Sequence, residues 1–385
     1  MVSAVLFITF FVLLVLNVPI AVCLGLSSAA AILYSGTSLT IVATNIYSGI
    51  SKFLLLAIPF FVLSGNIMAK AGISTRLIRF VDTCVGHRKG GIANVCIIVA
   101  CFFGAISGSG PATVAALGAV LIPAMVERGG FSAAFSTALM ATSSSIAIVI
   151  PPSIAFVVYA SITGVSIGDM FMAGIIPGIL MGLALVVVVM LEVRRNHVVP
   201  SNVEKASAKE RWNAFKDAFW GFLMPIIILG GIYGGFFTPT EAAAVSVVYG
   251  LFVGMVIYKE VKFKDLWEIL IDSAKTTGGI MLIVACASLF SFVCTRFGIS
   301  TAASELLARV AGNQFTFLLI CNIIFLIAGC FIDANSAMYI FIPIMLPVCK
   351  ALGYNVIAFG IMATVNLAIG QVTPPVGVNL FVAIG

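Results

Sequence analysis

The chain is a succession of apolar runs, each about as long as a helix that crosses a bilayer. About 20 apolar residues cross the hydrocarbon core as a helix. Hydrophobic residues make up 62% of the 385 residues and charged residues 9%, too few charges to cover a soluble fold of this length. The pattern therefore predicts an all-α polytopic membrane protein. The uninterrupted runs lie near 2–17, 19–36, 53–70, 170–193, 218–237, 239–258 and 276–295.

The second half of the chain repeats landmarks of the first half in the same order. Gly-Ile-Ser-Thr begins at Gly72 and again at Gly298, and the proline pairs begin at Pro151 and Pro374. Long Gly-containing stretches also open at Gly104 and Gly329. The nearly constant spacing predicts an internal repeat. Repeat 1 covers 1–193, a cytoplasmic amphipathic linker covers 194–217, and repeat 2 covers 218–385.

Each repeat also contains two apolar stretches that are interrupted. The first, at about 92–126 and 313–348, predicts a re-entrant helical hairpin; the second, at about 131–164 and from about 356, predicts a helix broken at the proline pair. Non-helical backbone at membrane depth persists only where protein, water or an ion satisfies it. Paired broken elements in inverted repeats are typical of the binding site of a secondary transporter.

The charges predict the orientation. Five crossings in repeat 1 make repeat 2 inverted in the membrane. With the N-terminus in the periplasm, sixteen Lys and Arg residues fall on the cytoplasmic side, and Lys52, Arg296, Arg309 and Lys350 fall outside. This distribution obeys the positive-inside rule, so the net charge of +6 is mainly a topology signal.

Residues for enzymatic chemistry are scarce. The two histidines, His87 and His197, lie among basic loop residues, and the nine cysteines stand singly in apolar runs. We expect no catalytic residues, no transition-metal site and no cofactor other than a coupling ion. A membrane-embedded acyltransferase or protease is therefore disfavoured, and a passive channel has little use for two hairpins.

The broken elements supply oxygen atoms. Hydroxyls and unwound carbonyls suit Na⁺, and half-helix N-termini suit carboxylates. Two such elements in each repeat predict two pseudo-symmetric cation sites. Asp333, at the second hairpin tip, and Arg296, at a span end, suit a polar acidic substrate. The alternatives are a helix-capping aspartate and an interfacial arginine, and helix capping is the favoured role of Glu241.

At these motifs the sequence resembles the large membrane subunit of tripartite ATP-independent periplasmic (TRAP) transporters, in the ion-transporter superfamily. The stretches that carry the resemblance follow one another in family order along the whole chain. They are IPFFVLSGNIMAKAG (58–72), GAISGSGPATVAALGAVLIPAM (104–125), IPPSIAFVVYA (150–160), GGFFTPTEAAAVSVVYG (234–250), DANSAMYIFIPIMLP (333–347) and LAIGQVTPPVGVNLF (367–381).

The resemblance implies Na⁺-driven import of an organic acid by an elevator motion, in the bacterial inner membrane. It implies a periplasmic substrate-binding protein and a small four-helix membrane partner. That partner would be a separate chain, because the N-terminus starts directly at the first large-subunit span. It assigns sodium binding to Ser107, Ser109, Val149 and Pro151 in one site and to Gly329, Gly370 and Thr373 in the other. Arg296, Asp333 and Ser153 become the substrate-binding candidates.

Two questions stay open at the level of sequence. The substrate is sialic acid or a C4-dicarboxylate, with sialic acid slightly favoured by an Asp beside an Arg. A stand-alone Na⁺- or H⁺-coupled dicarboxylate carrier or antiporter of the same superfamily is the alternative function. Repeat 2 also stops about one span short of repeat 1, which predicts a further span after residue 385.

Overall fold

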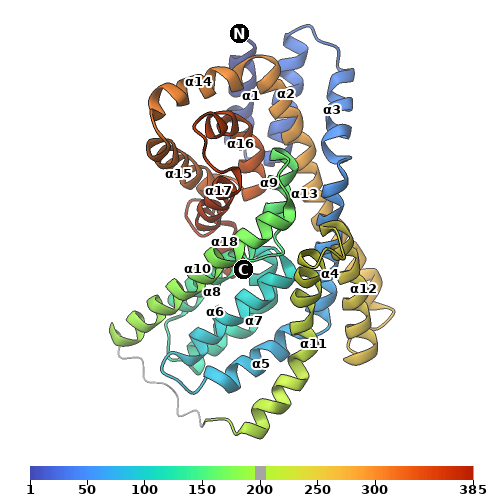
Figure 1. Ribbon diagram of the computed structural model, residues 1–385, viewed down its shortest axis with the longest axis vertical. Coiled ribbons are helices and arrows are strands. Elements are labelled where there is room, and N and C mark those ends of the chain that lie inside the picture. The colour runs from blue at the N-terminus through green and yellow to red at the C-terminus, as the bar shows by residue number, and fades with distance from the viewer. Residues whose placement is uncertain (196–204, 385) are drawn as a thin grey trace.

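The computed structural model describes residues 1–195 and 205–384, and the regular structure in these residues is helical (Figure 1). By length and composition, eight of the described helices could cross a membrane. Repeat 1 contains α1 (Val2–Val15), α2 (Ile20–Tyr34), α3 (Thr40–Ile50), α4 (Ala57–Lys70), α5 (Ile73–Val85), α6 (Gly91–Ser107), α7 (Gly110–Glu127), α8 (Ala133–Ser145), α9 (Ile154–Thr163) and α10 (Ile167–Arg195).

Repeat 2 follows the same order. It contains α11 (Ala208–Tyr233), α12 (Pro239–Phe252), α13 (Asp265–Arg296), α14 (Ile299–Ala311), α15 (Gln314–Phe331), α16 (Ala334–Ala351), α17 (Val356–Gly370) and α18 (Val378–Ile384). Helices α6 and α7 form the first predicted hairpin, and α15 and α16 form the second. The breaks at the two proline pairs separate α8 from α9 and α17 from α18.

The third span is longer than the sequence indicated. A span was predicted at 53–70, but α3 precedes it, and a short 3₁₀ helix, η1 (Phe53–Leu56), joins α3 to α4. Polar residues such as Thr44 and Asn45 interrupt the apolar run, so hydropathy did not predict α3. In the structure, Asn45 Nδ2 donates to the carbonyl of Ile41 within the helix (2.9 Å). Helices α3 and α4 both pack along α13, their single long counterpart in repeat 2.

Amphipathic helices α5 and α14 were not predicted as elements. Each begins at the isoleucine of the Gly-Ile-Ser-Thr landmark, directly after a left-handed glycine, Gly72 (φ 68°) or Gly298 (φ 72°). The linker predicted at 194–217 falls partly on residues 196–204, outside the described residues. Its last part already belongs to α11, which starts with a capping box formed by Ser207 and Glu210.

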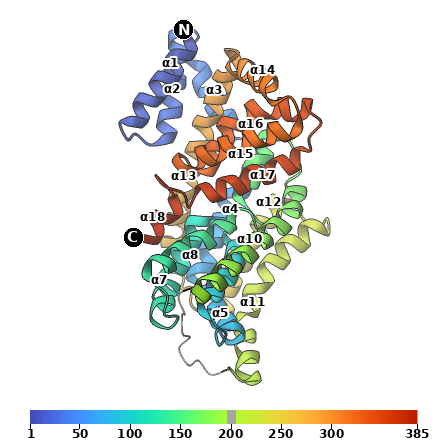
Figure 2. The same ribbon diagram turned by 90° about the vertical axis from the view of Figure 1, so that its left-hand side faces the viewer.

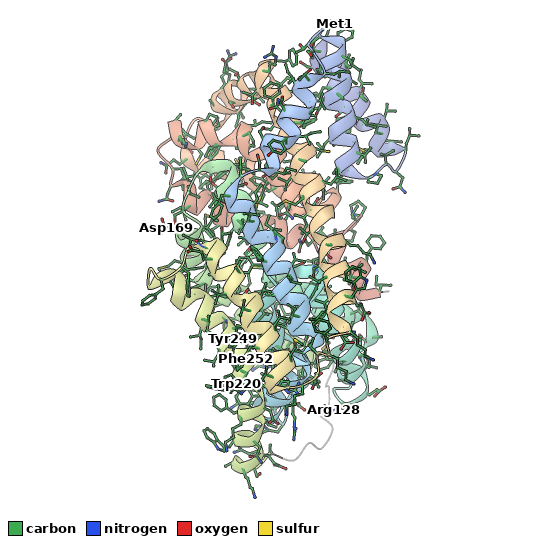
Figure 3. All side chains as sticks on the ribbon, turned by 90° about the vertical axis from the view of Figure 1, so that its right-hand side faces the viewer. Met1, Arg128, Asp169, Trp220, Tyr249 and Phe252 are labelled. Carbon is green, nitrogen blue, oxygen red and sulfur yellow. The ribbon has the colours of Figure 1, made fainter. Side chains whose placement is uncertain are left out.

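The two ends of the molecule carry different elements. Helices α1, α2 and α14 lie at the end that holds the N-terminus, whereas α5 and the start of α11 lie at the opposite end (Figure 1). Met1 and Arg128 stand toward these opposite ends (Figure 3). Ion pairs between neighbouring elements gather at the Arg128 end, including Lys70–Glu268 (3.0 Å) and Arg128–Asp82 (2.9 Å).

The two repeats interlock through the second halves of their broken helices. Helix α9 of repeat 1 packs on α16 and α17 (Figure 1). Helix α18 of repeat 2 packs on α7 and α8 (Figure 2). The Tyr159 hydroxyl donates to the carbonyl of Val356 (2.6 Å), and Ser161 Oγ lies 3.0 Å from Tyr339 Oη. Both hairpins and both broken helices therefore form one interwoven core.

Candidate transport site

The first hairpin tip meets the first helix break. Gly108 connects α6 to α7 in a left-handed conformation (φ 61°), and a Cβ on this residue would come within 2.8 Å of the carbonyl oxygen of Pro152. A Cβ on Gly65 of α4 would lie 3.3 Å from Ser107 Cα. The tip is therefore enclosed between the break and α4, where a side chain at Gly108 would not fit.

Hydroxyl groups and carbonyls concentrate at this tip. Ser107 Oγ lies 3.0 Å from Thr113 Oγ1, and Thr113 Oγ1 donates to the carbonyl of Ser109 (2.8 Å). Ser107 and Thr113 are buried. Of the predicted sodium ligands, Ser107 and Ser109 thus lie together, and Thr113, four residues beyond Ser109, is an addition that the sequence reasoning missed.

The other predicted binding residues of repeat 1 lie at the break between α8 and α9, and their polar groups point in different directions. Ser153 is fully buried; its hydroxyl donates to the carbonyl of Ile148 (2.5 Å) and accepts from the amide of Phe156 (3.3 Å). The Val149 carbonyl faces α10, since a Cβ on Gly174 would lie 2.6 Å from its oxygen. Pro151, which stands between Val149 and Ser153 in the sequence, is also buried. In this conformation Ser153 caps α9, and the Val149 carbonyl points at a neighbouring helix.

The second hairpin and the second break meet through glycine. A Cβ on Gly370 would come within 2.5 Å of Gly329 Cα, so α15 and α17 are in backbone contact there. The corresponding pair in repeat 1 is Gly104 and Ala147, where a Cβ on Gly104 would lie 2.8 Å from Ala147 Cα. The amide of Val376 also donates to the carbonyl of Cys330 (3.0 Å). Each hairpin is thus joined to the break of its own repeat.

The three sodium candidates of repeat 2 lie on these two elements. The amide of Thr373 donates to the carbonyl of Gly370 (3.0 Å), and Thr373 Oγ1 donates to the carbonyl of Ile369 (2.8 Å). Together with the Gly329–Gly370 contact, this places Gly329, Gly370 and Thr373 in one region.

The two charged candidates are not paired with each other. The Asp333 carboxylate caps α16, accepting from the amides of Asn335 (3.0 Å) and Ser336 (3.2 Å) and from the Ser336 hydroxyl. Arg296 is exposed in the last turn of α13. It takes part in none of the ion pairs between residues that the structure describes. Glu241 forms a capping box with Thr238, which confirms its predicted capping role.

A contact between the repeats was not foreseen. A Cβ on Gly110, at the start of α7, would meet Gln371 Oε1 and both terminal atoms of the Asn379 side chain. Asn379 is fully buried, and its Nδ2 lies 3.3 Å from Gln371 Oε1. The repeat spacing relates each residue to its own copy, so it contains no signal for a contact between different positions of the two repeats.

A small cavity of about 80 Å³ adjoins the first hairpin tip. Ser107 and Ser109 line it from the tip, Gly65 and Asn66 from α4, and Thr276 from α13. Its polar lining is neutral, made of hydroxyl and amide groups. Within the described residues, no group of His, Cys, Asp and Glu side chains could hold a metal ion, so any cation here would depend on neutral oxygen atoms.

Two related halves, each with a hairpin joined to a broken helix inside an apolar helical protein, define a polytopic membrane transporter. The chain belongs to a particular family of this class: residues 7–385 match the family described as tripartite ATP-independent periplasmic transporter, DctM component. It is a transport permease and not an enzyme. Permeases of this family sit in the bacterial inner membrane and work with a small membrane subunit and a substrate-binding protein.

Individual relatives cover nearly the whole chain. The C4-dicarboxylate TRAP transporter large permease protein of Rhodobacter capsulatus is 39% identical over 97% of this chain and 88% of its own length. The sialic acid TRAP transporter large permease protein of Vibrio cholerae is 36% identical over 92% of this chain and 82% of its own. The isethionate TRAP transporter permease of Oleidesulfovibrio alaskensis is 41% identical over 99% of this chain and 60% of its own.

Proposed function

We propose that this permease imports an organic anion with Na⁺, carrying it across the membrane by an elevator motion. The observation that supports this proposal is the meeting of a hairpin and a helix break in each repeat. The tip around Ser107 and the Gly329–Gly370 contact supply carbonyl and hydroxyl oxygens without a fixed negative charge. Such ligands suit a weakly bound monovalent cation that must be released after each transport cycle.

The moving unit in this proposal consists of both hairpins and both broken helices. Helices α9 and α18 each pack on the hairpin of the other repeat, which favours joint motion. Helices α3, α4 and α13, with α2 and α12 against them, form the fixed scaffold. The helices α5 and α14, which begin directly after Gly72 and Gly298, connect the two units.

The substrate in this proposal is a carboxylate such as sialic acid or a C4-dicarboxylate, delivered by a periplasmic binding protein and taken up with a small membrane subunit. Arg296 and Asp333 are its candidate contacts. The relatives named for a dicarboxylate, a sialic acid and a sulfonate support an anion and do not select among these classes.

The test is uptake into proteoliposomes that contain the permease and both partners. An inward Na⁺ gradient should drive accumulation of the acid, and replacing Na⁺ by K⁺ at constant pH should abolish it. Uptake that proceeds equally well in K⁺ would overturn Na⁺ coupling. Uptake by the permease alone would favour the stand-alone carrier or antiporter.

A further inference from the structure

Lys52 lies at a membrane depth that its sequence position did not suggest. Between Lys275 and Arg296, α13 has no charged residue, and this stretch of 20 residues is about 30 Å long, close to the thickness of the hydrocarbon core. A Cβ on Gly49 would lie 2.7 Å from Ser288 Oγ, and Asn66 Nδ2 donates to Ser273 Oγ (2.8 Å). These contacts place Lys52 beside the middle of that stretch, although the charge pattern had assigned it to the outer side.

The Lys52 ammonium group contacts the C-terminal end of α9, another element of repeat 1. Its Nζ donates to the carbonyl of Ser161 (2.8 Å), one of the last four carbonyls of α9, which have no partner inside the helix. A cation is favoured at this negative end of a helix dipole. Ser161 also contacts Tyr339 of the second hairpin through its hydroxyl (3.0 Å). Lys52 thus links the break between α3 and α4 to the elements of the proposed moving unit.

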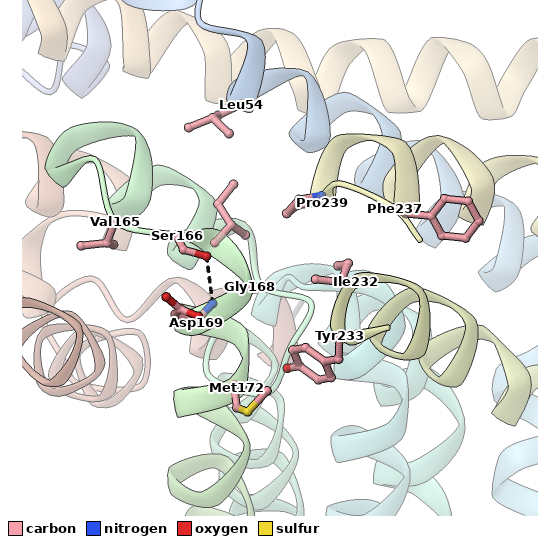
Figure 4. Close-up of a pocket in the computed structure, with 11 residues that line it drawn as sticks. Leu54, Val165, Ser166, Gly168, Asp169, Met172, Ile232, Tyr233, Phe237 and Pro239 are labelled. Atoms are coloured by element: carbon pink, nitrogen blue, oxygen red, sulfur yellow. Dashed lines mark hydrogen bonds between the residues drawn. The ribbon is translucent and has the colours of Figure 1, made fainter. Parts of the chain in front are cut away.

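A cavity is lined by residues that follow Lys52 and Ser161 in the chain, although neither of these two residues lines it. It has a volume of about 500 Å³ and is lined by Leu54, two residues after Lys52, and by Val165 and Ser166, shortly after Ser161 (Figure 4). Ile232 and Tyr233 of α11, Phe237 of the following connection and Pro239 of α12 line it on another side. Asp169 also lines it, but in Figure 4 its carboxylate points away from Ile232 and Tyr233. The cavity is large enough for a small organic acid.

We propose that Lys52 is an anion-binding residue of the fixed scaffold, which contacts the anionic group of the transported acid partway across the membrane. This inference rests on the proposed function. A charged residue at membrane depth is costly and is functional by default. An ammonium group has three donors, and the Ser161 carbonyl takes one of them. When α9 moves with the elevator, this contact has to break, which frees the ammonium group for the passing anion.

The first test compares Lys52→Met and Lys52→Arg in the reconstituted complex at saturating Na⁺, using the acid that the wild-type complex takes up. Lys52→Met should lower kcat/KM about tenfold or more, the loss expected for a hydrogen bond to a charged group, while Lys52→Arg keeps most of it. The Na⁺ concentration for half-maximal uptake should not change. Lys350→Met, which removes an exposed lysine at the end of α16, is the matched control. An unchanged kcat/KM in Lys52→Met would overturn the proposal.

A second test does not depend on transport. The purified permease is acetylated with an amine-reactive reagent in the presence of succinate, N-acetylneuraminate or isethionate, and Lys52 and Lys350 are followed by mass spectrometry. One of these acids should slow acetylation of Lys52 and leave Lys350 unaffected; equal rates with every acid would contradict anion binding. If Na⁺ dependence is absent but Lys52 is protected, the coupling proposal fails and the anion site stands.

Discussion

The two hairpins occupy equivalent places in the repeats, yet their tips are built from different chemistry. The tip between α6 and α7 is neutral, with a left-handed Gly108 and hydrogen bonds among Ser107, Ser109 and Thr113. The tip between α15 and α16 contains Asp333, whose carboxylate caps α16. Backbone architecture has been kept between the repeats while side-chain chemistry has diverged. We infer that the first tip serves the coupling cation and the second also serves the substrate.

The helices that connect the proposed scaffold and moving unit differ in the same way. On α5, the Arg76 guanidinium lies 3.9 Å above the Tyr258 ring and pairs with Glu260 (2.5 Å). The Tyr258 hydroxyl donates to the carbonyl of Asp217 (2.5 Å). Helix α14 has Ala302 at the position that corresponds to Arg76. The start of α5 is therefore held by the contacts of Arg76 with Tyr258 and Glu260, and α14 has no side chain that could make the same contacts at this position.

The largest expected effect concerns the backbone contacts that the repeats share. Gly370→Ala should lower the free energy of unfolding by about 1–3 kcal/mol, because the new Cβ collides with the backbone of Gly329. Gly104→Ala should have a similar or smaller effect, since its nearest contact is 2.8 Å rather than 2.5 Å. Gly278→Ala, which meets nothing within 4 Å, is the control. Equal thermal stability of the three variants in detergent would contradict this account of the packing.

The next prediction separates the charge of Asp333 from its capping role. Asp333→Ala should lose uptake and also about 1 kcal/mol of stability, because the α16 cap is removed. Asp333→Asn keeps a capping side chain and should retain stability while losing uptake. Arg296→Ala should likewise lose uptake without loss of assembly. Full uptake by Asp333→Asn would restrict this residue to capping and would remove the proposed difference between the tips.

A smaller effect is expected for the cation sites. Ser107→Ala and Thr373→Val each remove one hydroxyl near a proposed site, and each should raise the half-saturating Na⁺ concentration roughly twofold to tenfold, as for one lost hydrogen bond. Uptake measured across a Na⁺ series, with Ser48→Ala on α3 as the control, tests this. A shift in one variant alone would mean that the two repeats do not share cation binding.

The smallest effect is expected at the connecting helices. Arg76→Ala should lower the free energy of unfolding by about 0.5–1 kcal/mol. The effect is small because water screens the pair: the Arg76 side chain is 23% exposed and the Glu260 side chain 42%. Arg309→Ala on α14, which is exposed, should change stability less. Hydrogen exchange should become faster at the start of α5 in Arg76→Ala. Equal exchange in both variants would mean that the two connections are equivalent.

The sequence predicted the elements that depend on apolar length, glycine and proline, and it missed those that depend on packing. Both hairpins and both breaks follow from local patterns such as Pro151-Pro152 and Pro374-Pro375. Helix α3 was missed because polar residues such as Thr44 and Asn45 interrupt its apolar pattern; in the structure it packs on α13. The Gln371–Asn379 contact with α7 and the depth of Lys52 depend on tertiary structure, which no repeat spacing encodes.

In the proposed mechanism, each repeat contributes one cation site to a single transport cycle. This is tested most directly by measuring the equilibrium accumulation of the substrate in proteoliposomes against a series of Na⁺ gradients, with the membrane potential held at zero by K⁺ and valinomycin. The account predicts that the substrate ratio rises at least with the square of the Na⁺ ratio. A substrate ratio that rises only in proportion to the Na⁺ ratio, or that does not respond to it, would contradict two cation sites.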